Sequence, residues 1–256
     1  MNHSRVSTLK FNALRFCLGL MLPLLGWAGD SDGFRPLFNG VDLKGWDGNP
    51  KLWSVVDGVI VGQTTAAGKL AYNEFLIWTG GPVTDFELRL KMRQTGNNSG
   101  VQYRSREHPE VGRWVVGGYQ CDIHPIPQNN GQLYEERGRK LIGRNGHSVV
   151  IDPRGEKWLV EELGLVTTNA TAWNEYSILA RGNYIEHRIN GRTVFKLWDF
   201  QADARALLGL LALQIHQGPP MRVEVSEILL KTLPRAESKP FDGSLIPKGA
   251  TRVPMP

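Results

Sequence analysis

The strongest constraint on the fold of this chain is a period of two in the order of its apolar and polar residues. In the stretch DFELRLKMR, residues 85–93, apolar residues alternate with charged ones. Successive side chains of a β-strand point to opposite faces, so this stretch predicts a strand with one buried face. The same alternation recurs in SGVQYRS, GYQCDIH, EYSILARG, NYIEHRI, TVFKLW, LLALQIH and RVEVSEILLK.

Two dipeptides mark tight turns between such strands. Asp57-Gly58 and Asn190-Gly191 each stand between β-rich runs, and these residue types accept the positive φ angles of a two-residue hairpin. No run of comparable length has a helical period, although EKWLVEELG and DARALLG are expected to form short helices or turns. Many short strands with almost no helix predict an all-β antiparallel sandwich or barrel, with a single domain at residues 33–233.

The two ends of the chain depart from this pattern. Arg5, Lys10 and Arg15 precede the apolar run FCLGLMLPLLGWAG, and no acidic residue occurs before Asp30. This order is typical of an export signal, so residues 1–28 are predicted to be a signal peptide and the mature protein to be periplasmic or secreted. The tail at 234–256 is rich in proline and lacks periodicity, which predicts an extension that is loose or lies on the surface.

The net charge gives no support to two classes of partner. The formal net charge is +5, and three of the basic residues belong to the signal peptide. The mature domain is therefore close to neutral, which gives no argument for nucleic acid or for a membrane as a partner after signal removal.

Three alternating stretches share an unusual polar face. Opposite their apolar residues they carry amides, a carboxylate, imidazoles and a guanidinium, with almost no lysine or glutamate. The residues are Gln102 and Arg104 in SGVQYRS, Gln120, Asp122 and His124 in GYQCDIHP, and Gln214 and His216 in LLALQIHQG. Two interpretations remain open at this point, a plain polar sheet face and a ligand-binding groove.

The stretch GQLYEERGRK at 131–140 follows the central strand closely. It is either a charged loop or a rim over the polar face, built from Tyr134, Glu135, Glu136 and Arg137. A divalent metal ion is also possible, because Asp122, His124, Glu135 and His216 offer oxygen and nitrogen ligands, although no metal-binding motif links them. The sequence has no phosphate-binding loop and no GxSxG elbow, so it does not support a phosphotransferase or a serine hydrolase.

The order and spacing of several stretches resemble one known family. These stretches are FRPLFNGVDLKGW, NNSGVQYRS, GYQCDIHP, GQLYEE, WNEYSILARGNYIEHRINGRTV and LLALQIHQGPPMRVEVSEILLK, which run from Phe34 to Lys231. Together they are similar to the 3-keto-disaccharide hydrolase domain family. The resemblance implies an all-β, antiparallel jelly-roll β-sandwich of the concanavalin-like type, whose concave groove would be the polar face.

The resemblance also implies a substrate and a reaction. The substrate would be a small glycoside or oligosaccharide oxidised at C3, supplied by an oxidoreductase that generates keto sugars. A 3-keto group acidifies the C2–H, so a base removes that proton, the C1 substituent leaves, and water adds to the product. Many family members have Tyr-Glu-x-Gln on the central strand, whereas here Gln120 follows the tyrosine and the carboxylate is moved to Asp122.

The resemblance, together with the polar face and the stretch that follows it, gives the expected role of each residue. The base is Asp122 or Glu135, with His216 as its acid/base partner. Arg104, Gln120 and Gln214 would orient the hydroxyls or the keto oxygen, with Gln102, His124, Tyr134, Glu136 and Arg137 as further substrate-binding residues. This chemistry requires Arg104, Asp122 and His216 to meet in one hollow.

Two rival functions use the same type of fold. A retaining β-glucanase would need a Glu-x-Asp-x-x-Glu strand, and QCDIHP lacks both glutamates. A noncatalytic carbohydrate-binding module would also have amides and aromatic residues in a groove, but it would need no base.

Overall fold

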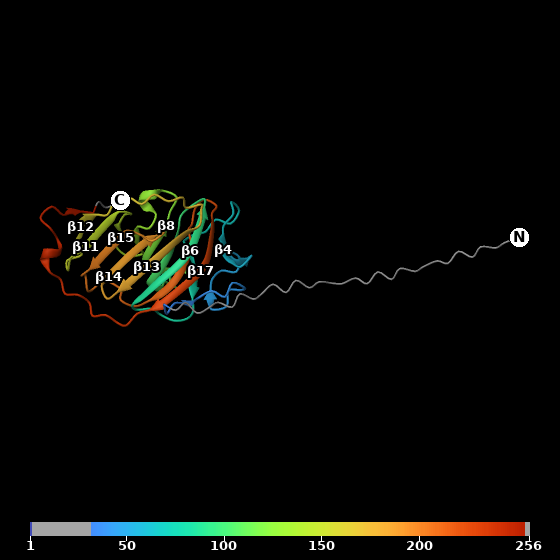
Figure 1. Cartoon of the computed structure of the whole chain (residues 1–256), viewed down its shortest axis with the longest axis horizontal. Helices are drawn as coiled ribbons and strands as arrows, with labels where there is room; N and C mark the ends of the chain where they lie inside the picture. Colours follow the sequence, from blue (N-terminus) through green and yellow to red (C-terminus); the bar gives the residue numbers. More distant parts are fainter. Residues whose placement is uncertain (2–31, 254–256) are drawn as a thin grey trace.

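The computed structural model describes residue 1 and residues 32–253, and the strands of this part form two sheets (Figure 1). Apart from Met1, the signal peptide predicted at residues 1–28 lies outside the described residues. None of the helices in the described part is long and apolar enough to cross a membrane. The described helices are two short 3-10 turns, η1 at Pro127–Asn129 and η2 at Gly243–Leu245.

The larger sheet has eleven strands. Its main path is β18 (Thr251–Arg252), β12 (Lys157–Glu162), β11 (His147–Ile151), β15 (Arg192–Asp199), β14 (Tyr184–Ile189), β13 (Asn174–Arg181), β6 (Phe86–Thr95), β17 (Arg222–Thr232), β4 (Val59–Gln63) and β3 (Trp53–Val56), with β1 (Arg35–Pro36) beside β17. Its described pairings are antiparallel except β11 with β15, which is parallel.

The smaller sheet has seven strands and carries the polar residues singled out above. Its order is β10 (Lys140–Gly143), β9 (Leu133–Glu136), β8 (Val116–Ile123), β7 (Ser99–Glu107), β16 (Leu210–Ile215), β5 (Glu74–Trp78) and β2 (Trp46–Asp47). β16 lies beside β7, which is far earlier in the sequence, so residues from distant segments share one surface.

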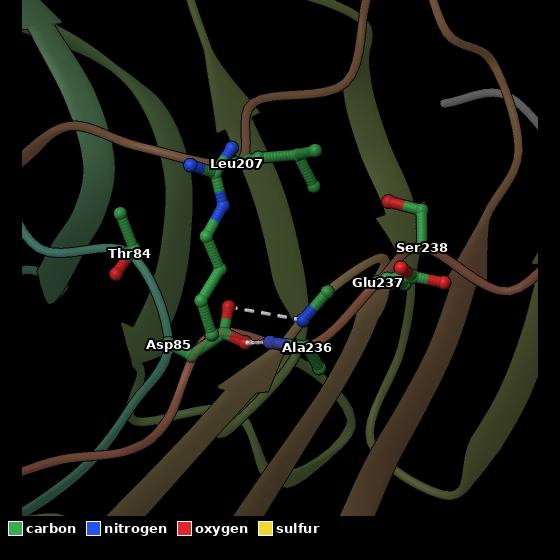
Figure 2. A pocket seen from close by; sticks show the side chains of 8 residues that line it. Thr84, Asp85, Leu207, Ala236, Glu237 and Ser238 are labelled. Atoms are coloured by element: carbon green, nitrogen blue, oxygen red, sulfur yellow. Dashed lines mark hydrogen bonds between the residues drawn. The ribbon is translucent and has the colours of Figure 1, made fainter.

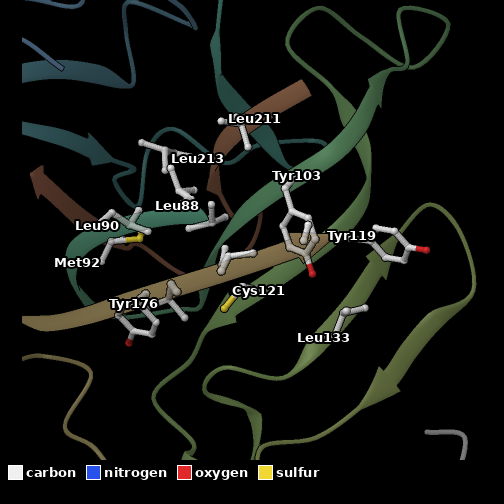
Figure 3. Packing of buried hydrophobic residues seen from close by; sticks show 14 of the residues in the cluster. Leu88, Leu90, Met92, Tyr103, Tyr119, Cys121, Leu133, Tyr176, Leu211 and Leu213 are labelled. Atoms are coloured by element: carbon white, nitrogen blue, oxygen red, sulfur yellow. The ribbon is translucent and has the colours of Figure 1, made fainter. Parts of the chain in front are cut away.

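The core lies between the two sheets (Figure 3). Every second residue of β6 is buried, as its alternation predicts, and Leu88 and Leu90 face inward with Cys121 of β8 and Leu213 of β16. Burying one such aliphatic side chain stabilises the fold by about 1.5–3 kcal/mol. The inward face of each strand is therefore fixed by the hydrophobic effect, and the polar residues between the apolar ones are sent outward.

The two predicted hairpins are confirmed. Asp57 and Gly58 join β3 to β4 with φ angles of 50° and 77°, and Asn190 and Gly191 join β14 to β15 with 49° and 77°. Both pairs thus have the positive φ angles that a type I′ turn requires.

One local prediction is wrong. The stretch EKWLVEELG was expected to be a helix or a turn, but residues 157–162 of it form β12. Pairing with β11 on one side and β18 on the other satisfies the backbone of this stretch, so tertiary contacts override its local preference. The stretch DARALLG lies in turns before β16, within its prediction.

The proline-rich tail runs along strand ends and the β12 edge of the larger sheet over its described part, residues 234–253. Its last strand, β18, pairs with β12. Earlier in the tail, the Ala236 N–H donates to Asp85 Oδ2 at 2.6 Å, and the Lys239 N–H donates to Asn183 Oδ1 at 2.8 Å. The tail is therefore bound to the sandwich at several separate points.

Candidate functional site

A cavity of about 410 Å³ opens on the outer face of the smaller sheet. β8, β9 and β16 supply five of its lining residues, because their apolar side chains fill the core and the residues between them point outward. The lining residues are Asn73, Asn98, Gln120, Asp122, His124, Gln132, Tyr134, Glu136, Lys140, Gln214, His216 and Gln217. The cavity thus brings together seven of the residues predicted from the sequence, namely Gln120, Asp122, His124, Tyr134, Glu136, Gln214 and His216.

A directional chain of amides leads to Asp122. Ser105 Oγ donates to Gln102 Oε1 at 2.6 Å, and Gln102 Nε2 donates to Gln120 Oε1 at 2.9 Å. Gln120 Nε2 then donates to Asp122 Oδ1 at 2.7 Å. Each amide accepts on one side and donates on the other, so the orientation of Gln120 is fixed from below. Gln102 is completely buried and acts as a support under the cavity rather than as part of its lining.

The Asp122 carboxyl is buried, with 4% of the residue exposed. Its second oxygen, Oδ2, accepts a hydrogen bond from Gln132 Nε2 at 2.7 Å. Burial raises the pKa of Asp122 to about 7, and the Glu136 charge adds to this rise, while the bonds from Gln120 and Gln132 oppose it. A carboxyl group with a pKa near 7 can accept and release a proton near neutral pH.

Two polar atoms of the cavity lining have no hydrogen-bond partner among the described residues. They are Gln214 Nε2, a donor on a completely buried residue, and Gln132 Oε1, an acceptor. Leaving a buried polar atom unpaired costs about 1–3 kcal/mol.

Both histidines of the cavity have the Nδ1 atom of the ring engaged by the protein. His124 Nδ1 accepts the Ile126 N–H at 3.0 Å. His216 Nδ1 lies 2.5 Å from the Gln217 carbonyl oxygen and 3.0 Å from Asn97 Nδ2. In each ring, Nε2 is the nitrogen left for a ligand.

The structure places Arg104 outside this cavity, so its predicted meeting with Asp122 and His216 is wrong. A β-bulge shifts the register of β7 against β8 between Tyr103 and Arg106, and Arg104 takes a φ of 47°. The extra residue breaks the alternation on which the prediction rested. The buried guanidinium instead donates to Asp85 Oδ1 at 2.9 Å.

Asp85 is the centre of a structural junction (Figure 2). Besides the bond from Arg104, its carboxylate accepts the backbone N–H groups of Gly182 and Ala236. The arginine also donates to the carbonyl oxygens of Thr84 and Gly182. Arg104 therefore joins the two sheets, while Asp85 also binds the tail, and the guanidinium is directed away from the 410 Å³ cavity.

Glu135 and Arg137 are also outside this cavity. Glu135 lies between Tyr134 and Glu136 on β9, so its side chain turns to the opposite face, where it accepts a 2.5 Å bond from Arg139 Nε. Arg137 lies in the turn after β9 and lines a second cavity of about 430 Å³. Of the two carboxylates considered as the base, only Asp122 lines the cavity with His216.

No group of three or more His, Cys, Asp or Glu side chains is placed to hold a metal ion in the part of the chain that the structure describes. The set of four ligands considered from the sequence is not assembled, because Glu135 faces away from the other three. Asp122 is instead surrounded by amide donors.

Sequence reasoning missed five lining residues, which are Asn73, Asn98, Gln132, Lys140 and Gln217. Gln132 could have been found, because it lies two residues before Tyr134 and alternation continues through the segment. The others come from loops or strand ends, where no periodic signal exists.

Comparisons with known proteins agree with this fold. A model of the 3-keto-alpha-glucoside-1,2-lyase-like domain matches residues 33–231. Two Parabacteroides distasonis structures, both provisionally assigned as glycosyl hydrolases, are similar. One is 20% identical with a TM-score of 0.53, covering 78% of this chain and 99% of that chain. The other is 22% identical with a TM-score of 0.52, covering 79% and 95%.

A Bacillus subtilis protein of unknown function with a galectin-like fold is 11% identical with a TM-score of 0.51, covering 79% of this chain and 96% of that chain. No curated protein matches this sequence. The structural likenesses confirm the predicted jelly-roll sandwich, and the family model confirms the resemblance seen in the sequence. The chain therefore belongs to the 3-keto-alpha-glucoside-1,2-lyase-like family and is a carbohydrate-active domain of the 3-keto-disaccharide hydrolase type.

Proposed function

We propose that this protein is an enzyme that cleaves 3-keto-glycosides in the 410 Å³ cavity, with Asp122 as the base. The observation that carries the proposal is a buried carboxyl, held by two amide donors beside unpaired polar atoms, whose burial raises its pKa to about 7. A module that only binds sugars needs no group that accepts a proton, whereas this reaction requires one.

The reaction would begin at C2. The Asp122 carboxylate accepts the C2 proton, and the electron pair of that bond forms an enolate whose charge lies on the C3 oxygen. Gln214 lines the cavity, and its Nε2, which has no partner among the described residues, would donate to a substrate oxygen once the amide turns toward the cavity. Once turned, such a donor stabilises a developing oxyanion more than water does, because it needs no further reorientation during the reaction.

The second step would expel the leaving group. The enolate electrons return to re-form the C3 carbonyl, a C1–C2 double bond forms, and the C1–O bond breaks. His216, at the edge of the same cavity, would protonate the departing oxygen. Water then adds across the double bond, with its oxygen bonding to C1 and a proton returning to C2, which regenerates the acid and base forms.

The test is a comparison of turnover and binding. Asp122→Asn should lower kcat on a 3-keto-glucoside by about 10²–10⁴-fold while the affinity for the substrate changes by only a few fold. Asp203→Asn, which changes an exposed carboxylate outside this cavity, is the control and should leave both unchanged. Wild-type protein that binds but never turns over 3-keto-glycosides would instead favour a noncatalytic carbohydrate-binding module.

The cellular setting belongs to the same proposal. The signal-like N-terminus supports export to the periplasm or beyond, where an oxidoreductase would have to supply the keto sugar. N-terminal sequencing of the protein recovered from cell fractions tests the export. A mature protein that still begins at Met1 would contradict it.

A further inference from the structure

His124 has a hydrogen-bonding pattern that fixes where its proton sits. The Ile126 backbone N–H points at His124 Nδ1 from 3.0 Å, and a backbone N–H can only donate. Nδ1 must therefore keep its lone pair, which leaves the proton of the neutral ring on Nε2. The backbone of His124 is itself held, because its N–H donates to Asn130 Oδ1 at 3.1 Å.

The surroundings also keep this ring uncharged. A proton on Nδ1 would face the Ile126 N–H, so the cationic form loses the bond that positions the ring. Burial lowers the pKa of His124, and the nearby His216 and Arg144 charges lower it further. Asp122 lies two residues earlier, near the end of β8, and both residues line the 410 Å³ cavity.

We propose that the Ile126 N–H locks His124 as a neutral Nε2–H donor to the C3 oxygen of the bound keto sugar. This inference rests on the proposed function and assigns the residue that polarises the ketone while Asp122 removes the C2 proton. A neutral imidazole beside a carboxylate base is a known solution for enolising a ketone. An imidazolium at the same place would lower the basicity of Asp122. A neutral ring therefore donates to the ketone without weakening the base.

The lock can be removed without changing the imidazole. Ile126→Pro deletes the donating N–H, and the φ of Ile126, −83°, is close to the range of proline. Its carbonyl would still accept from Asn129 and Asn130, and its side chain is largely exposed. Ile126→Ala makes a similar change to the side chain but keeps the N–H, so it is the matched control.

Nitrogen-15 NMR of the His124 ring measures the lock directly and needs no substrate. Wild type and Ile126→Ala should show the proton on Nε2 at pH 7, whereas Ile126→Pro should show a mixture of tautomers and a higher pKa of His124. A wild-type ring with its proton on Nδ1, or doubly protonated at pH 7, would overturn the proposal.

The donor role is tested on a 3-keto-glucoside. His124→Phe, which has no donor, should lower kcat by about 100-fold, and His124→Gln, which keeps an N–H near the position of Nε2, should stay within about tenfold of wild type. Equal kcat in both variants and wild type, while Asp122→Asn is inactive, would remove His124 from the reaction but leave the proposed function intact. Absence of turnover in wild type would remove the proposed function, and the NMR result would still decide the state of the ring.

Discussion

At the scale of single residues, the raised pKa of Asp122 suits a base in the proposed reaction, but it lowers the stability of the fold as the pH rises. Its pKa in the folded protein is about 7, above the ordinary value of 3.8 that it regains on unfolding. Between these two pH values the unfolded chain has released the proton and the folded chain still holds it. This contribution to stability is therefore fully present below pH 3.8, falls as the pH rises, and is lost above about pH 7.

Replacement by an uncharged amide should remove this pH dependence. We expect Asp122→Asn to gain stability relative to wild type as the pH rises from 4 to 8, by at most about 4 kcal/mol, because each pKa unit is worth about 1.4 kcal/mol. The Gln132 amide can rotate to accept from the new amide, since its Oε1 has no partner among the described residues. Denaturant unfolding of both proteins at pH 4 and pH 8 measures the difference. Parallel pH dependence of the two proteins would contradict a raised pKa of Asp122.

Catalysis should depend on pH in the opposite direction. The base must be ionised, so kcat of the wild type should rise about tenfold per pH unit below pH 7 and level off above it. A pH–rate profile measured from pH 5 to pH 9 tests this. A profile that falls through pH 7 would assign the titrating group to an acid instead.

At the scale of elements, the amide chain depends on a glycine in β7. Gly100 pairs with Asp122, and a Cβ built on it would lie 2.5 Å from Cδ of Gln120. Its φ is not positive, so Gly100→Ala should cost about 1–3 kcal/mol through crowding alone. The displaced Gln120 amide would lose its bond to Asp122, so we expect kcat to fall about tenfold and the lower limb of the pH–rate profile to move to higher pH.

The matched control for this variant is Gly249→Ala, because a Cβ at Gly249 meets open space and its φ is also not positive. This control should leave stability and kcat close to wild type. If Gly100→Ala lowers stability but not kcat, the orientation of Gln120 is not needed for turnover.

The elements also show what the sequence could predict. Alternation placed Gln120, Asp122 and Gln214 correctly on the outer face, because burial of Cys121 and Leu213 leaves no other register. The prediction from alternation was wrong at Arg104, because the β-bulge in β7 inserts an extra residue that the sequence pattern does not reveal. Alternation within β9 turns Glu135 away from Tyr134 and Glu136, a consequence that was missed because the segment was interpreted as a loop or a rim and not as a strand.

At the scale of the whole molecule, the cavity exists because of strand order. Gln214 reaches the Asp122 cavity only because β16 inserts between β7 and β5, and nothing local in the sequence specifies that neighbour. The resemblance to a family predicted the jelly-roll sandwich, but the amide chain under Asp122 depends on contacts across neighbouring strands that no sequence motif marks. The cavity and the tail lie on different sheets, so contacts of the tail can stabilise the fold without touching the cavity.

That separation leads to a prediction about the tail. Removing all residues after Leu233 deletes the Ala236 bond to Asp85, the Lys239 bonds to Asn183 and the β18 pairing with β12. Removing only the residues after Pro240 deletes β18 but keeps the first two sets of bonds. We expect both truncations to lower Tm and the longer one to lower it further, by about 2–4 °C for each kcal/mol lost.

Turnover should respond differently from stability in these truncations. No described tail residue lines the 410 Å³ cavity, so kcat on a 3-keto-glucoside at 20 °C should stay within twofold of wild type in both. Thermal unfolding and initial rates measured on the same samples test the separation. A truncation that loses turnover while keeping its Tm would show that the tail acts on the site. An unchanged Tm in both truncations would show instead that the contacts with Asp85 and Asn183 contribute nothing to stability. The Arg104–Asp85 pair would then suffice to hold the two sheets at this junction.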